Sequence, residues 1–113
     1  PHAIGERIAQ VTATSGYDHC YVVNGAPGQL RPTAVVVEPK SGRAMEIHTT
    51  QPGVQLYTGN FLSGAAEGAG LKQHEAFCLE TQHYPDSPNK PTFPTTLLEP
   101  GQTFQETTTL RFY

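Results

Sequence analysis

Apolar and polar residues alternate along most of this chain, and the alternation predicts short strands rather than helices. The predicted strands are residues 7–14, 17–23, 31–38, 43–50, 54–59, 76–79 and 103–113. Turn residues separate them, and the turns at 24–28 and 39–42 each predict a hairpin. No internal repeat and no long helical period occur, so the pattern predicts an all-β fold, an antiparallel β-sandwich.

The same pattern indicates which side chains are buried. Residues 34–37 read Ala-Val-Val-Val without alternation, which is typical of a strand buried on both faces. In the next strand Met45 and Ile47 should face the core, with Ala44, Glu46 and His48 on the opposite face. Residues 62–74 are rich in Gly and Ala with no clear period, so we expect a mobile loop there, at the rim of a cleft.

Composition limits the size of the fold and its partners. A chain of 113 residues has room for one domain, so we expect a single all-β unit over residues 1–113. The net charge of −3 and the lack of any basic cluster argue against a nucleic-acid partner. No apolar run approaches the roughly 20 residues of a membrane span, and we therefore expect no membrane partner.

Two cysteines, Cys20 and Cys78, lie far apart in apolar segments. This placement favours small buried thiols in a reducing compartment over a disulfide, so we expect a cytoplasmic protein. A zinc site built from them with His19 and His74 would lack any recognisable ligand spacing, and we expect no bound metal.

Glu80 follows the apolar run 76–79 and precedes a loop stiffened by four prolines, Pro85, Pro88, Pro91 and Pro94. One interpretation is an edge charge that faces water. The other is a partly desolvated carboxylate at a strand end, an environment that suits a general base. Asp18 raises a similar question, because it shares a strand face with Cys20 and Val22. It should lie at the open end of the strand or be hydrogen-bonded in a cleft.

Three stretches carry a family resemblance. Residues 79–89 read Leu-Glu-Thr-Gln-His-Tyr-Pro-Asp-Ser-Pro-Asn, residues 16–21 read Gly-Tyr-Asp-His-Cys-Tyr, and residues 49–61 contain Thr-Gln-Pro-Gly-Val-Gln followed by Tyr-Thr-Gly-Asn. In their order along the chain, 16–21, 49–61 and 79–89, they resemble the C-terminal part of the aldose 1-epimerase family. The resemblance implies that the chain is the C-terminal part of a large β-supersandwich.

The resemblance also implies a chemistry. Members of the family interconvert the α and β anomers of an aldose, such as galactose or glucose, by acid–base ring opening without a metal or organic cofactor. By this resemblance Glu80 is the general base, and Asp18 and Gln55 bind sugar hydroxyls. The family's general acid is a histidine in its N-terminal part, and none of the five histidines here matches that motif. We therefore expect the isolated chain to be catalytically incomplete.

Two alternatives belong to other functional classes. One is a non-catalytic carbohydrate-binding sandwich in which Tyr57 or Tyr84 is a stacking platform. The other is an interaction module that associates with itself or with an N-terminal complement. The chain begins at Pro1 without a methionine and family members are longer, so we expect strand edges and apolar faces that such a partner would cover.

Overall fold

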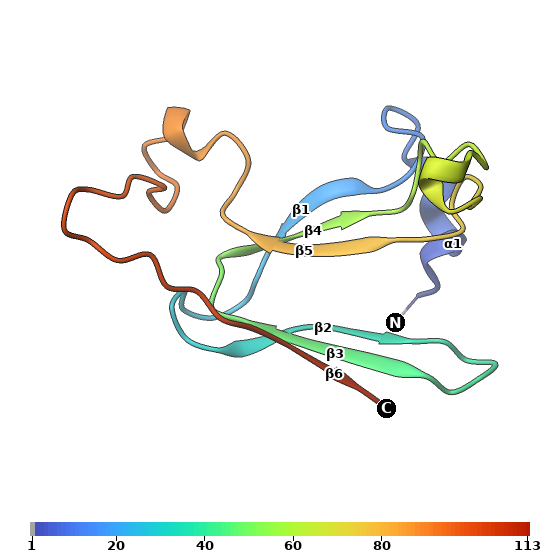
Figure 1. Cartoon of the computed structure of the whole chain (residues 1–113), viewed down its shortest axis with the longest axis horizontal. Helices are drawn as coiled ribbons and strands as arrows, with labels where there is room; N and C mark the ends of the chain where they lie inside the picture. Colours follow the sequence, from blue (N-terminus) through green and yellow to red (C-terminus); the bar gives the residue numbers. More distant parts are fainter. Residues whose placement is uncertain (1) are drawn as a thin grey trace. The chain divides into compact units, whose positions relative to one another are not determined.

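The computed structural model describes residues 2–113, which form two three-stranded sheets and little helix (Figure 1). This arrangement confirms the predicted all-β class. The strands are β1 (Asp18–Val22), β2 (Arg31–Val37), β3 (Ala44–Thr49), β4 (Gly53–Tyr57), β5 (Cys78–Gln82) and β6 (Thr108–Phe112). The only helical pieces in this described range are α1 (Ile4–Arg7) and three 3₁₀ turns, η1 (Ile8–Gln10), η2 (Ala66–Gly68) and η3 (Ser87–Asn89). None of these is long and apolar enough to cross a membrane.

The chain divides into two compact units. Unit 1 contains the residues up to Tyr21 together with Gln55–Glu80, and unit 2 contains Val22–Val54 together with Thr81–Tyr113. Each unit is described by itself below. The single unit expected over residues 1–113 stays a prediction.

The sheet that carries most of the candidate site has the strand order β1-β4-β5. At one end of β1 the Val23 amide donates to the Pro52 carbonyl at 2.9 Å, and at the other end the Thr58 amide donates to the Tyr17 carbonyl at 3.1 Å. From the first of these bonds to the second, the residue numbers fall along β1 and rise along β4, so the two strands are antiparallel. The central strand, β4, therefore has β1 on one side and β5 on the other.

The second sheet has the order β2-β3-β6, with both pairs antiparallel. Its register places Ala34, Ile47 and Leu110 in one cross-strand row, and Ile47 is 2% exposed, as the alternation predicts. The expected burial of both faces of β2 is wrong, because Val35 is 68% exposed. Val35 lies opposite Glu46, whose carboxylate accepts hydrogen bonds from His48 and Tyr113, so this face of the sheet is polar and meets solvent.

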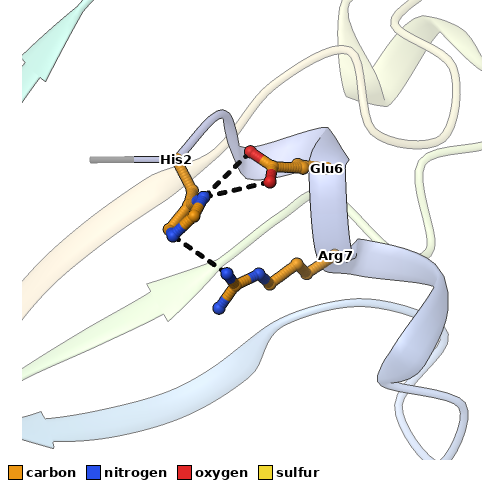
Figure 2. Close-up of polar contacts among 3 residues, drawn as sticks. All are labelled: His2, Glu6 and Arg7. Carbon is orange, nitrogen blue, oxygen red and sulfur yellow. Dashed lines mark hydrogen bonds and ion pairs between the residues drawn. The ribbon is translucent and has the colours of Figure 1, made fainter.

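The strand predicted over residues 7–14 is wrong, since this segment starts in α1 and η1. Ile4 and Ile8 are four residues apart, which is helical spacing, and both line a cavity of about 290 Å³ together with Phe77. Both are half-buried on this one side of the helical segment, which outweighs the loose alternation. Figure 2 shows the His2 ring between two side chains of this helix, with Nδ1 3.0 Å from the Glu6 carboxylate and Nε2 accepting from Arg7 at 2.9 Å.

The predicted hairpin at 24–28 does not form either, because β1 pairs with β4 whereas β2 pairs with β3. Arg31 explains how the turn is held. Arg31 is 7% exposed, and its guanidinium donates to the carbonyl of Asn24 and, on the other side, to the carbonyl of Gln51. The Gly28 amide adds a bond to the Thr50 carbonyl at 2.9 Å. The turn is therefore tied to the segment that leads into β4.

Two loops complete the chain. Residues 62–74 contain η2 and a short bridge between Ser63 and Lys72, and whether this loop is mobile stays a prediction. The proline-rich segment after β5 has no strand and only the single turn η3, in agreement with the predicted extended loop.

Candidate functional site

Asp18 and Gln55 lie on neighbouring strands, and their side chains touch. The Gln55 Nε2 group donates to Asp18 Oδ1 at 2.7 Å. The side chains therefore point to the same face of the sheet, which also carries Cys20 by alternation along β1 and Tyr57 by alternation along β4. The sequence placed each residue on a face of its own strand, and the antiparallel pairing brings the two faces together.

The Gln55 side chain has one atom without a partner. Its Oε1 oxygen is buried and accepts no hydrogen bond among residues 2–113. A buried carbonyl oxygen without a donor is costly, by about 1–3 kcal/mol, and a ligand hydroxyl would satisfy it. Asp18 is exposed, so its second oxygen is open to the same ligand. The pair can thus present two acceptors side by side.

Glu80 lies in β5, the strand on the other side of β4. The sequence placed it at the end of a strand, but the strand continues to Gln82 and Glu80 is its middle residue. Alternation continues through Leu79 and Thr81, which are half-buried, and this keeps the segment extended. The expected partial desolvation is also absent: Glu80 is exposed, as is Cys78 two residues before it on the same face.

Two histidines adjoin the candidate residues in sequence. His19 Nδ1 accepts a hydrogen bond from the Asp18 amide at 3.0 Å, which leaves the proton of a neutral ring on Nε2. Alternation along β1 points its ring to the face opposite Asp18. His83 lines a cavity of about 290 Å³ in unit 2, whose other walls come from residues 95–98 and 103–106. Within residues 2–113 neither ring hydrogen-bonds the side chain of Asp18, Gln55 or Glu80, and His19 meets Asp18 only at its backbone amide.

The cysteines differ from the prediction in their burial. Cys78 is exposed and Cys20 is half-buried, and both are free thiols. Burial raises the pKa of the Cys20 thiol, so it stays protonated at neutral pH. Within residues 2–113 no group of three or more His, Cys, Asp or Glu side chains has the arrangement of a metal site.

The aromatic rings proposed as stacking platforms are arranged differently. The Tyr84 hydroxyl donates to the Pro52 carbonyl at 3.1 Å and its ring meets Phe93 edge-on, so Tyr84 braces the proline-rich loop. Tyr57 stacks on Phe61 with the ring centroids 6.4 Å apart, and Phe61 is 73% exposed. Of the two tyrosines, Tyr57 lies on the strand that carries Gln55, and Phe61 lies in the loop after it.

Comparison with known proteins identifies the family of this chain. The family model described as aldose 1-epimerase matches residues 1–111. The chain belongs to the aldose 1-epimerase family. Galactose mutarotase from Bos taurus is 44% identical over 115 residues, which cover 99% of this chain and 33% of the bovine protein. Galactose mutarotase from Homo sapiens is 46% identical over 101 residues, which cover 87% of this chain and 29% of the human protein.

A bacterial relative, aldose 1-epimerase from Haemophilus influenzae, is 38% identical over 81 residues, covering 70% of this chain and 23% of that protein. The chain thus spans about a third or less of the length of the curated relatives that it matches. Membership of the epimerase family confirms the resemblance that the three motifs indicated. The roles of Glu80, Asp18 and Gln55 stay predictions.

Sequence reasoning missed the residues that support the epimerase motifs. Thr58 and Asn60 are each 2% exposed and hydrogen-bond the backbone of Tyr17, and Arg31 binds five carbonyls. Thr58 and Asn60 belong to the block at residues 49–61, in which the sequence indicates a role only for Gln55 and Tyr57. Their partners are backbone atoms some forty residues away, so no local pattern marks them.

Proposed function

We propose that this chain supplies the general base and two sugar-binding side chains of an aldose 1-epimerase that interconverts the α and β anomers of an aldose such as galactose or glucose. The observation that supports it most is the Gln55–Asp18 contact, which leaves a buried acceptor on Gln55 unpaired beside an exposed carboxylate. The strands that carry Asp18, Gln55 and Glu80 lie in one sheet, in the order β1-β4-β5. Family membership supplies the reaction class.

In the proposed binding step, the sugar places hydroxyl groups against the paired side chains. A hydroxyl donates to the Gln55 Oε1 atom, and a neighbouring hydroxyl donates to the free oxygen of Asp18. The Gln55 amide group remains bound to Asp18 at 2.7 Å, so each side chain fixes the orientation of the other. These contacts hold hydroxyls that do not react, and they should therefore affect substrate binding more than the chemical step.

In the proposed chemical step, Glu80 takes the proton from the C1 hydroxyl while an acid protonates the ring oxygen. The bond between C1 and the ring oxygen breaks and leaves an open-chain aldehyde. Rotation about C1–C2 then presents the other face of the carbonyl. On closure the former ring oxygen attacks C1, the acid recovers its proton and Glu80 returns its proton to the carbonyl oxygen.

We assign the acid to a residue outside these 113. The family's acid motif has no counterpart around His2, His19, His48, His74 or His83. In addition, Nε2 of His48 is engaged with Glu46, and Nε2 of His74 is 2.8 Å from the Ser15 carbonyl. The base and the sugar contacts would then come from this chain and the acid from another part of the site.

A second candidate function is carbohydrate binding without catalysis. The stacked Tyr57 and Phe61 rings favour it, because Tyr57 lies on the strand of Gln55 and Phe61, in the loop that follows this strand, is largely exposed. Binding of galactose with no change in the rate of mutarotation would support this alternative. Glu80 would then have no chemical role.

We further propose that the uncovered apolar faces bind another polypeptide, either a second copy of the chain or an N-terminal complement. In unit 2, Leu110 is 54% and Phe112 is 71% exposed, although both share a sheet face with the buried Ile47. A large exposed apolar patch is typical of an interface. We also propose a cytoplasmic location, which the two free thiols support.

The experiment that tests the proposed reaction is Glu80→Gln in the protein at its natural length. Loss of the base should lower the mutarotation rate at least about a hundredfold, measured by polarimetry on freshly dissolved α-D-galactose. Glu67→Gln is the matched control, because Glu67 is also exposed and lies outside the sheet. A Glu80→Gln protein with a nearly normal rate and an unchanged unfolding midpoint would remove Glu80 from the base role.

A further inference from the structure

A closed circle of hydrogen bonds surrounds the backbone of Tyr17, the residue before Asp18. The Tyr17 amide donates to Thr58 Oγ1 at 2.9 Å, the Thr58 hydroxyl donates to Asn60 Oδ1 at 2.6 Å, and Asn60 Nδ2 donates to the Tyr17 carbonyl at 3.0 Å. A flipped Asn60 amide would place its oxygen against the Tyr17 carbonyl oxygen, so the Asn60 amide has only one consistent orientation. Every polar atom of the two side chains in this circle has a partner.

The circle is buried and tightly fitted. Thr58 and Asn60 are each 2% exposed. The neighbouring Gly16 has a φ of +141°, and a Cβ atom placed there would lie 2.2 Å from Asn60 Oδ1 and 2.8 Å from Thr58 Oγ1. Only glycine leaves room for the two polar side chains to reach the backbone. The backbone that leads into Asp18 is therefore fixed from both sides.

Two further contacts hold the loop that carries Asn60. The Gln73 side chain donates to the Asn60 carbonyl at 2.9 Å, and the His74 ring is bonded to the Ser15 carbonyl. The backbone on either side of Gly16 is thus held by side chains from residues 58–74. All of these residues belong to unit 1, as do Asp18 and Gln55.

We propose that Thr58 and Asn60 are positioning residues for sugar binding, which act by fixing the Tyr17 backbone so that the Asp18 carboxylate meets the Gln55 amide and the substrate hydroxyls. This proposal rests on the proposed function of Asp18. The 2.7 Å contact between Asp18 and Gln55 depends on where β1 begins relative to β4. The circle fixes that start, because Thr58 follows β4 directly and Tyr17 precedes β1 directly.

The test uses Thr58→Val, which keeps the shape of the side chain but removes the hydroxyl, with Thr58→Ser as the matched control that keeps it. In the protein at its natural length, Thr58→Val should raise KM for galactose about threefold to tenfold, the range expected for one lost hydrogen bond. The kcat should change less than about twofold. Thr58→Ser should restore most of the KM, and Asn60→Asp, which cannot donate to the Tyr17 carbonyl, provides a second variant should Thr58→Val not fold.

A double-mutant cycle separates positioning from a general loss of stability. In the Asp18→Asn protein, Thr58→Val should raise KM no further, because its effect passes through the Asp18 carboxylate. Multiplied effects in the double variant, or an unchanged KM in a folded Thr58→Val protein, would overturn the proposal. The NMR signal of the Gln55 side-chain amide should also shift in Thr58→Val, and a constant signal would count against it.

These measurements test the sugar-binding role of Asp18 separately from the positioning role of Thr58. An unchanged KM in Asp18→Asn alone would remove Asp18 from sugar binding, and the positioning role would fall with it. In that case a shifted Gln55 signal would still show that Thr58 controls the contact. A raised KM in Asp18→Asn with a normal Thr58→Val protein would refute only the positioning role.

Discussion

Arg31→Lys should destabilise unit 2 strongly although it keeps the charge. The Arg31 guanidinium donates to the carbonyls of residues 24, 29, 49, 50 and 51, at distances between 2.9 and 3.3 Å. A lysine ammonium has three donors at a single point, so at least two of these five hydrogen bonds would be lost, and of the five carbonyls the one of Thr50 also accepts from the Gly28 amide. Each buried acceptor left unpaired costs about 1–3 kcal/mol, so two such acceptors give an expected loss of about 2–6 kcal/mol.

The assay for Arg31→Lys is urea unfolding followed by circular dichroism, with the slope of the transition compared between variants to confirm that it stays two-state. Arg43→Lys is the matched control, because Arg43 is exposed and its guanidinium bonds only to the Ser41 hydroxyl within the described residues. We expect that control to stay within about 0.5 kcal/mol of the original protein. A loss below about 1 kcal/mol for Arg31→Lys would refute the reasoning, since the five carbonyls would then not depend on the forked donor.

Three further predictions concern the sugar contacts, a turn and the isolated chain. Asp18→Asn and Gln55→Ala should mainly raise KM in polarimetric assays, and a large fall in kcat at constant KM would contradict their binding role. The Ser41 hydroxyl, followed by the amides of Lys40 and Ser41, holds the pKa of Glu38 below its usual range. The turn is therefore stabilised above the ordinary pKa of a glutamate, about 4.3, and loses this support as the pH falls through the lowered value. Ser41→Ala should move the NMR titration of Glu38 upward, and an unmoved titration would exclude the hydroxyl as the cause. The 113-residue chain alone should show at most weak mutarotation and should sediment as an oligomer unless an N-terminal part is added, whereas full activity of the isolated monomer would place the acid within these residues, with His19 or His83 the first to test.

Much of the fold could be predicted because strands carry a local signal. Alternation located β2, β3, β4 and β6 within a few residues, and the turn residues at 39–42 predicted the β2–β3 hairpin. Pairing carries no such signal. Strands that follow one another in the sequence usually pair, and this predicts β1 beside β2. Instead, β1 pairs with β4, which lies more than thirty residues away in the sequence. The strand predicted over residues 7–14 is wrong because Ile4, which precedes this range, forms with Ile8 the four-residue spacing of a helical turn.

For the candidate site too, one part of the arrangement follows from the local sequence and another part depends on contacts between distant residues. Asp18, Gln55 and Glu80 stand in family motifs, and alternation assigned a face to each strand. What alternation could not supply was the relative register of β1 and β4, which decides that Asp18 meets Gln55. That register depends on Thr58 and Asn60, whose side chains bind backbone atoms and therefore leave no complementary residue type to recognise in the sequence.

The segment at residues 49–61 is held by hydrogen bonds at both of its ends. Its first residues present the carbonyls of Thr49, Thr50 and Gln51 to Arg31, and its last residues present Thr58 and Asn60 to Tyr17. Gln55 lies between the two anchored ends, in a strand of only five residues. A short strand held at both ends has little freedom to shift along its neighbours, and this helps to keep the Gln55 side chain at its 2.7 Å contact with Asp18. The family block at 49–61 is therefore best understood as a support for Gln55 as well as its location, and substitutions at its ends should alter sugar binding before they alter the chemistry.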